Sequence, residues 1–407
     1  MSLYYVQKFL YELNRSPQLQ EAYTADRHGV LEPYSLTDEE AEALTAPDIG
    51  KLYVLGVNGQ ILMHFAAFHQ IEWQDYLQRM RDGIDDHGPV RAGVYAITGY
   101  EGTRAHSESL GQDEEWSDGS DPTPRGGVMP LVYAGVCSHA PGIRGRKDLA
   151  DPQVRDAFYA AYDGMRADLE ASGAEAVIVI AAEHFANFFM NNMPSFAVGM
   201  ADFYDGPIED PGWLGIERFR APGDRDLSER VITEVMNTVD IAYAEEWLFD
   251  HGIAVPLSFL TPRFDLPVIP VNINCQGPPL APLHRAWAFG EALRRAVDAV
   301  PEKVAIIGTG GISHWPATPD SGKINWEWDQ DFMAKWCDNG RDALLDYDDL
   351  QVYADAGQGG FEIRTFLAVS AAAGGAQGTV HFMEPIPIFA VSCTIASYDL
   401  STSDPAG

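Results

Sequence analysis

The sequence predicts an α/β protein in which a mostly parallel central sheet is flanked by helices and follows an all-α domain. Four short runs rich in valine and isoleucine lack the alternation of a half-solvated strand, which indicates buried strands. They span residues 131–136, 176–181, 268–271 and 304–307. Helical patterns lie between them, notably at 156–171 and 285–300. Alternating strands and helices imply crossover units that cover both faces of a sheet.

The first 87 residues predict helices only. Thr37 opens one helix with a capping-box pattern that Glu40 completes, and residues 61–80 form an amphipathic run. From Gly88 the composition shifts to Gly, Ser, Asp, Glu and Pro, which is typical of a linker or long surface loop. We therefore expect four segments. They are a helical domain (1–87), an acidic linker (88–128), an α/β domain (129–398) and a polar tail (399–407).

Charge and cysteine content narrow the class of protein. The chain has 407 residues, 46% of them hydrophobic, and 60 acidic against 27 basic side chains give a formal net charge of −33. This excess opposes binding to nucleic acid or to an anionic membrane. The four cysteines show no zinc-type or redox-type spacing, and the chain shows no signal peptide and no run of 18 apolar residues. We expect a soluble, cytoplasmic protein.

Histidines follow the predicted strands where those strands end. His139 follows the first strand, His184 the second, and His314 the strand at 304–307. In open α/β sheets, ligands bind beyond the carboxyl ends of the strands. Three histidines delivered there can converge on one metal ion or one substrate.

Each of these histidines also has a simpler interpretation. His139 precedes a sharp Ala-Pro-Gly turn and could be a turn residue bonded to nearby backbone, and His184 could be a satisfied core group. His314 ends a run with three glycines in four residues, which lets the backbone approach another group closely. A nucleotide site fits poorly, because the Lys-Ser/Thr of a P-loop and the third glycine of a dinucleotide fingerprint are missing.

Two further residues belong to the candidate site. His251 lies beside Gly252 in what we expect to be a fixed loop. Glu362 lies in the first turn of a predicted helix that runs to Gly374, where it could stabilise the helix dipole or act as a carboxylate ligand. Two histidines and one carboxylate form the facial triad of non-haem Fe(II) oxygenases, which leaves open positions for a bidentate substrate and dioxygen.

The remaining histidines show no metal-binding pattern. His64 and His69 are five residues apart on a predicted helix and so lie about 140° apart around its axis, too far to chelate together. The others lie in predicted loops, lack partners or begin a helix: His28, His87, His106, His381 and His284.

At these motifs the region 129–398 resembles the catalytic subunit of class III extradiol dioxygenases of the protocatechuate 4,5-dioxygenase type. The matching segments, in the same order, are 137–142, 183–189, 250–252, 308–314 and 360–362. Residues 1–87, with the segment 55–59, resemble the small helical subunit of the same enzymes, here fused ahead of the catalytic region.

The resemblance implies that His139, His184 and Glu362 ligate Fe(II) and that His314 is the acid/base residue. It also implies that His251 lies beside the substrate.

Asn274 and Gln276 match a pocket segment of the family. Glu183 departs from the family pattern, because several relatives have Asp before the second ligand histidine. The implied reaction is extradiol cleavage of a catechol-type diol by O2 to a semialdehyde-type product. The helical domain would act as a lid, and we expect a homodimer.

Alternatives remain at this stage. The same iron chemistry could act on an aminophenol or a hydroxypyridine. Two histidines and one glutamate also bind Zn²⁺ in hydrolases, with one position open. A non-catalytic metal-binding interaction module of the same fold is a third reading, which the presence of His314 and of the helical segment disfavours.

Overall fold

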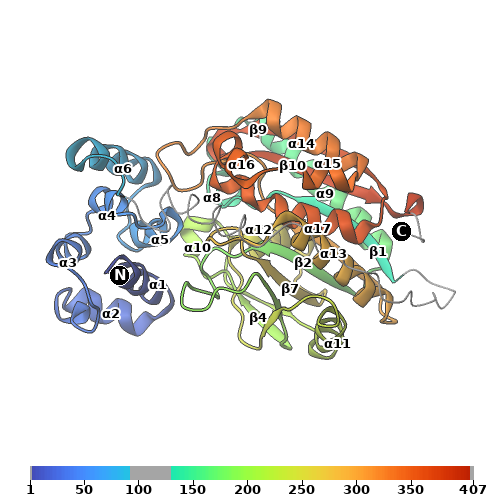
Figure 1. Ribbon diagram of the computed structural model, residues 1–407, viewed down its shortest axis with the longest axis horizontal. Coiled ribbons are helices and arrows are strands. Elements are labelled where there is room, and N and C mark those ends of the chain that lie inside the picture. Colours follow the sequence, from blue (N-terminus) through green and yellow to red (C-terminus); the bar gives the residue numbers. More distant parts are fainter. Residues whose placement is uncertain (1, 92–129, 404–407) are drawn as a thin grey trace.

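The computed structural model describes residues 2–91 and 130–403. A helical region and an α/β region lie side by side, with the helical region in blue in Figure 1. The linker predicted at 88–128 lies outside the described residues except for its first four. Of these, Arg91 packs on the helical region: its backbone N–H donates to the Val54 carbonyl at 2.7 Å, and its guanidinium pairs with Glu39 at 2.7 Å.

The helical region contains six α-helices among the described residues. They are α1 (Ser2–Arg15), α2 (Pro17–Ala25), α3 (Asp38–Thr45), α4 (Ile49–Leu55), α5 (Gly59–Phe68) and α6 (Trp73–His87). The predicted capping box of Thr37 and Glu40 is confirmed at the start of α3. The run expected at 61–80 is not one helix. Gln70 adopts a left-handed φ of 55°, and the Ile71 N–H closes back on the Ala66 carbonyl, which ends α5.

The α/β region is built on an eight-stranded sheet in the order β6-β3-β7-β2-β8-β1-β10-β9. The four predicted strands form its parallel centre, as β1 (Leu131–Cys137), β2 (Ala176–Ala182), β7 (Val268–Ile273) and β8 (Val304–Thr309). The outer strands were not predicted. They are β3 (Phe196–Gly199), β6 (Ala242–Ala244), β9 (Gln377–Ile386) and β10 (Val391–Asp399), and β3 and β10 pair antiparallel with the centre. A separate hairpin comprises β4 (Phe203–Gly206) and β5 (Phe219–Pro222).

Helices cover both faces of the sheet, as expected for crossover units (Figure 1). Alternate residues of β2 enter different clusters: Ile178 and Ile180 join one, Val177 and Val179 the other. The first cluster includes α11 (Arg225–Val235), α13 (Leu283–Asp298), α14 (Trp326–Asp338) and α17 (Ile363–Ala373); the second includes α9 (Pro152–Ser172) and α12 (His251–Leu260). Shorter helices are α8 (Gly142–Gly145), α10 (Pro211–Leu214), α15 (Arg341–Leu345) and α16 (Asp349–Ala356). Within the described residues, no helix is long and apolar enough to cross a bilayer.

Three local predictions need correction. His251 begins α12 rather than sitting in a loop. Glu362 ends a 3-10 helix, Gln358–Glu362, directly before α17, so it is not in the first turn of that helix. His381 lies within β9, and its Nε2 contacts the Ser397 hydroxyl at 2.7 Å across to β10. His381 thus lies in a strand that pairs with the next strand along the chain.

Specific contacts join the helical region to the α/β region. The ring of Tyr11 stacks on that of Phe189 with centroids 4.6 Å apart. Arg81 donates to the Pro319 carbonyl at 2.8 Å. Ala317 lies in the hydrophobic cluster of the helical region, and its carbonyl approaches Gly59 so closely that a Cβ there would lie 2.1 Å from the oxygen. The loop after His314 is therefore anchored on the helical region.

This close approach predicts that Gly59→Ala is destabilising. The added methyl forces α5 and the Ala317 loop apart, and overpacking of this kind costs about 1–3 kcal/mol. Gly164→Ala is the matched control, because it lies inside α9 with no heavy atom within 4 Å of the added Cβ. It should stabilise by about 0.5–1 kcal/mol. Thermal unfolding followed by circular dichroism compares the two, and a Gly59→Ala protein that melts no lower than wild type would contradict the described contact.

Candidate functional site

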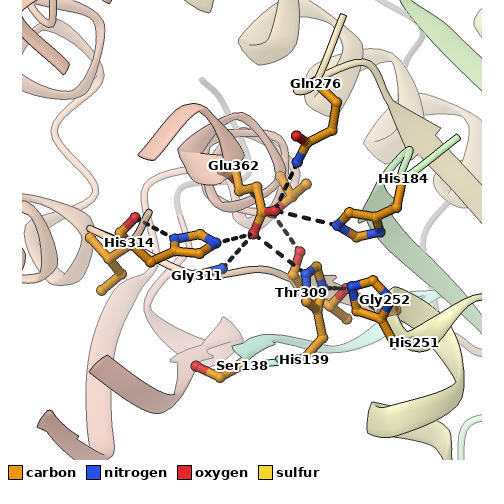
Figure 2. Close-up of polar contacts among 12 residues, drawn as sticks. Ser138, His139, His184, His251, Gly252, Gln276, Thr309, Gly311, His314 and Glu362 are labelled. Atoms are coloured by element: carbon orange, nitrogen blue, oxygen red, sulfur yellow. Dashed lines mark hydrogen bonds and ion pairs between the residues drawn. The ribbon is translucent and has the colours of Figure 1, made fainter. Parts of the chain in front are cut away.

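The residues predicted from strand ends converge at one place. Figure 2 shows Glu362 at the centre, with His139, His184 and His314 turned toward its carboxylate and His251 beside them. The first three histidines follow β1, β2 and β8, which are adjacent in the order β2-β8-β1. All five side chains are buried. The predicted convergence of the strand-end histidines is confirmed.

The Glu362 carboxylate is surrounded by nitrogen atoms. Its Oε2 lies 3.4 Å from His139 Nε2 and 3.6 Å from His314 Nε2, and its Oε1 lies 3.4 Å from His184 Nε2. The Gly311 N–H donates to Oε2 at 2.7 Å, and the Gln276 amide donates to Oε1 at 3.3 Å. Burial alone would raise the pKa of Glu362, but the facing imidazoles hold that pKa well below its ordinary value. The side chain is therefore an ionised carboxylate.

Hydrogen bonds orient the two rings nearest the carboxylate. The Thr309 hydroxyl donates to the Gly252 carbonyl at 2.7 Å, so it accepts from His139 Nδ1–H at 2.9 Å. The Asp250 carboxylate accepts from His184 Nδ1–H at 2.9 Å. With the proton on Nδ1, the Nε2 atom is the one that can coordinate a metal ion. Hydrogen-bond partners of metal-binding histidines impose this arrangement.

The other two rings are held in the same way. The Glu209 carboxylate accepts from both His251 Nδ1–H, at 2.7 Å, and the His251 backbone N–H, at 2.9 Å. His314 Nδ1–H donates to the Ile312 carbonyl at 3.1 Å. Among the residues that the structure describes, the Nε2 atom of each imidazole therefore has no hydrogen-bond partner outside this cluster.

The turns that carry these rings depend on particular neighbours. The Glu183 carboxylate accepts the backbone N–H groups of Asn187 at 2.8 Å and Phe188 at 3.3 Å, which closes the turn after His184. Phe185 in this turn has a left-handed φ of 59°, a conformation that costs a non-glycine residue about 1–3 kcal/mol. This strained residue directly follows His184.

Gly311 and Gly359 make room for the ring of His314. A Cβ at Gly311 would lie 2.5 Å from the His314 Cε1, and a Cβ at Gly359 would lie 2.3 Å from the same atom. The imidazole is therefore confined between two stretches of backbone that only glycine permits. The close backbone approach that the glycine-rich run predicted is confirmed, and the group that the backbone approaches is the ring of His314.

The cluster fits a divalent metal ion. Two donors each about 2.1 Å from one ion and roughly 90–110° apart lie about 3.0–3.4 Å from each other. The distances from Glu362 to His139 Nε2 and His184 Nε2 are at the upper end of that range. Among the described residues, donor atoms of His139, His184 and His251 also lie within 4.8 Å of one another. Two histidines are common to both sets, and the third donor is Glu362 or His251.

The charges at the cluster favour a bound cation. Burial lowers the pKa of His139 to about 4, so its ring is neutral. Burial also opposes protonation of His184, but the Asp250 carboxylate outweighs it and raises the pKa of His184 to about 10. A metal ion placed between His184 and Glu362 would take the position of the Nε2 proton, because ligands must be deprotonated to bind.

A pocket of about 570 Å³, measured out to its open mouth, adjoins the cluster. The sequence predicted that the helical region acts as a lid, but it did not identify which side chains of that region line the pocket. Gln60, Met63 and Trp73 line the pocket together with the metal-site residues, and Arg146 and Ser321 line it from the α/β region. No spacing pattern could identify these residues, because they come from elements far apart in the chain. His64, for which we expected no role, also lies close enough for the charges of Glu209 and His251 to act on it, and burial lowers its pKa to about 4.

The two predicted pocket residues have different environments. Gln276 reaches Glu362. The amide of Asn274 is used within the turn: its nitrogen donates to the Gly277 carbonyl at 2.7 Å, and its oxygen accepts the N–H groups of Gln276 and Gly277. Asn274 thus shapes the loop that presents Gln276.

Comparison with known proteins places both regions in described families. Residues 133–394 match the catalytic LigB subunit of aromatic ring-opening dioxygenase, and residues 6–85 match the LigA subunit of the aromatic-ring-opening dioxygenase LigAB. A solved structure, the uncharacterized protein JW3007 from Escherichia coli K12, aligns at a TM-score of 0.43 with 16% identity, covering 59% of this chain and 91% of that one.

Curated relatives share the name 2,3-dihydroxyphenylpropionate/2,3-dihydroxicinnamic acid 1,2-dioxygenase. The protein of Xanthobacter autotrophicus is 29% identical over 318 residues, which cover 66% of this chain and 97% of the relative. That of Burkholderia vietnamiensis is 35% identical over 194 residues, covering 47% of this chain and 58% of the relative. That of Rhodococcus sp is 31% identical over 193 residues, covering 47% and 59%.

The LigB match alone covers well over half of the chain and spans every strand-end histidine described above. It confirms the resemblance to class III extradiol dioxygenases that the sequence motifs indicated. The chain belongs to the family of the catalytic LigB subunit of aromatic ring-opening dioxygenases, carries a LigA-like region ahead of it, and is a ring-opening dioxygenase.

Proposed function

We propose that this dioxygenase uses Fe(II) to cleave a catechol beside its two hydroxyl groups, giving a semialdehyde-type product. One observation carries the proposal: two imidazole Nε2 atoms and one ionised carboxylate meet at the side of a pocket. This donor set is typical of non-haem iron oxygenases. The names of the curated relatives, which specify dihydroxyphenyl substrates and 1,2-dioxygenase activity, support the extradiol assignment.

We assign the metal to His139, His184 and Glu362. The Glu362 carboxylate lies 3.4 Å from the Nε2 atoms of both histidines, and the same three residues are the ligands that the family resemblance implies. Held by these three residues, the ion would supply open coordination sites for substrate and dioxygen and the redox chemistry of the reaction. Asp250 and Thr309 fix the tautomers that this binding needs. Zinc hydrolysis uses a similar donor set, but membership of a dioxygenase family disfavours it here.

His314 is the proposed acid/base residue. Its Nδ1–H is committed to the Ile312 carbonyl, so Nε2 can accept a proton from a catechol hydroxyl and later return it to the opened ring. Imidazole is the side chain best suited to both transfers near neutral pH. His251, held by Glu209 in the same pocket, is placed to contact the substrate.

The helical region is the proposed lid. Gln60, Met63 and Trp73 line the pocket, which excludes water from the reacting groups.

An aminophenol or a hydroxypyridine would fit the same metal chemistry, and a catechol is preferred because the relatives act on dihydroxyphenyl compounds. The cytoplasmic location and the homodimer stay predictions.

The ligand assignment predicts which variants lose iron. His139→Ala, His184→Ala and Glu362→Gln should each fail to bind Fe(II) tightly, because each removes one of three donors. His251→Ala is the matched comparison and should still bind one Fe(II) per chain. Anaerobic metal analysis of the purified proteins measures this. If His251→Ala lost iron while Glu362→Gln kept it, His251 would be the third ligand.

Thr309 gives a test of ring orientation. Thr309→Val keeps the side-chain shape but removes the hydroxyl that accepts from His139 Nδ1–H. Loss of a hydrogen bond to the Nδ1–H of a metal-binding histidine lowers metal affinity by about 10- to 100-fold. Thr309→Ser restores the hydroxyl and should bind iron nearly as wild type does. Anaerobic Fe(II) titration compares the three, and equal affinities for Thr309→Val and wild type would mean that this hydrogen bond does not orient the ligand.

The role of His314 predicts a separation of iron content from activity. His314→Ala should retain iron, yet it should open the ring about 10²–10⁴ times more slowly, the usual loss when one positioned acid/base group is removed. The yellow absorbance expected of a semialdehyde product reports the rate, and metal analysis of the same sample reports the iron. A fully active His314→Ala protein would exclude His314 from the reaction, and an iron-free one would make it a ligand.

A further inference from the structure

One cation in the pocket has no role in the chemistry proposed above. Among the described residues that line the pocket, Arg146 is the only lysine or arginine. It directly follows α8, seven residues after His139, and its guanidinium lies 4.2 Å from the centre of the Trp73 ring in the helical region. The described part of the chain offers it no carboxylate at ion-pair distance, so its charge faces the pocket without a counterion.

Within residues 2–91 and 130–403, Arg146 has no acidic partner at ion-pair distance, which distinguishes it from exposed arginines of this acidic protein. Arg220 pairs with Asp205 at 2.7 Å, and Arg230 pairs with Glu302 at 2.6 Å. Burial lowers the pKa of Arg146 to about 10, although the charge of Glu72 opposes this effect, so the group stays charged at neutral pH. A half-buried charge without a partner is unfavourable, and an anion entering the pocket would relieve it.

The surroundings of Arg146 fix where its charge lies. A Cβ at Gly145 would lie 2.2 Å from the Trp213 carbonyl, so α8 packs directly against α10. The Arg146 N–H donates to the Gly142 carbonyl at 2.9 Å, which closes the last turn of α8. The indole of Trp73 covers the guanidinium, and a guanidinium stacked on an aromatic ring can still pair through its N–H edge.

We propose that Arg146 determines substrate specificity by binding a carboxylate substituent of the aromatic substrate, and that Trp73 positions the guanidinium for this contact. The proposal rests on the function proposed above and adds to it the charge of the substrate. A planar monoanion matches one planar guanidinium in shape and charge, whereas a phosphate carries nearly two charges. With a formal net charge of −33, the protein repels anions in general, so an anionic substrate needs such a local cation.

The main test compares carboxylated catechols with their neutral methyl esters on the iron-loaded enzyme. The pairs are 3-(2,3-dihydroxyphenyl)propanoate and 3,4-dihydroxybenzoate, each with its ester. Wild type should prefer at least one acid over its ester by about 10- to 100-fold in kcat/KM, chiefly through KM, as expected for one hydrogen-bonded charge pair. Arg146→Gln should abolish this preference, and Arg146→Lys should keep part of it. Arg146→Glu should instead favour a catechol with an ammonium side chain.

Matched variants separate specificity from folding. Arg144→Gln changes the neighbouring arginine of α8, which lies over Phe259 and does not line the pocket, and it should keep the wild-type ratio of acid to ester. Trp73→Leu should lower the ratio, and Trp73→Phe should restore most of it. A wild-type enzyme that shows no preference in either pair, or an Arg146→Gln enzyme that keeps the preference, would overturn the proposal.

A binding experiment without chemistry distinguishes this proposal from the proposed function. Calorimetry of the metal-free full-length protein with 3-phenylpropanoate and with its neutral amide tests the carboxylate contact alone. We expect wild type to bind the acid at least tenfold more tightly than the amide. The Arg146→Gln protein should bind both compounds with the same weak affinity. Such binding with no turnover of any catechol would refute the dioxygenase assignment only. Turnover of both esters and acids at equal efficiency, with no selective binding, would refute the role of Arg146 only.

Discussion

The structure depends most on keeping one ionised carboxylate buried. Glu362 is 1% exposed, and an isolated charge at such a position would cost several kcal/mol. Its oxygens are compensated by a backbone N–H of Gly311, an amide of Gln276 and the surrounding imidazoles. Those imidazoles are held in turn by Thr309 and Asp250. The same arrangement that makes the charge tolerable prepares it to receive a metal cation.

The parallel centre of the sheet is what allows this arrangement. Strands β2, β8 and β1 are neighbours that point the same way, so the residues that follow them emerge at one edge. Glu362 reaches that edge from a 3-10 helix at the start of α17, which packs on β8 and β1. Asp250 and His251 arrive through the beginning of α12. Five segments that lie far apart in the sequence therefore build one site.

The two regions of the chain share a pocket and also share hydrophobic packing. Phe185, Phe189 and Ala317 belong to the α/β region, yet they pack in the cluster formed by the helices. Phe185 directly follows His184, and Ala317 lies three residues after His314. The helical region consequently contacts the turns that carry two histidines of the site as well as the pocket above them. A shift of the helices would therefore displace the residues of both turns.

The amino-acid sequence by itself determined the four central strands, the helical character of the first 87 residues and the strand-end histidines, because these depend on local periodicity and on short motifs. It also indicated Glu362 through its motif. Only the tertiary structure decided which strands lie at the edges of the sheet, that Gln276 reaches Glu362 while Asn274 shapes a turn, and that Arg146 meets Trp73 in the pocket. The physical reason is that these features arise from contacts between segments far apart in the chain, whose free energy depends on the packing of the whole fold and leaves no periodic signal in any one segment.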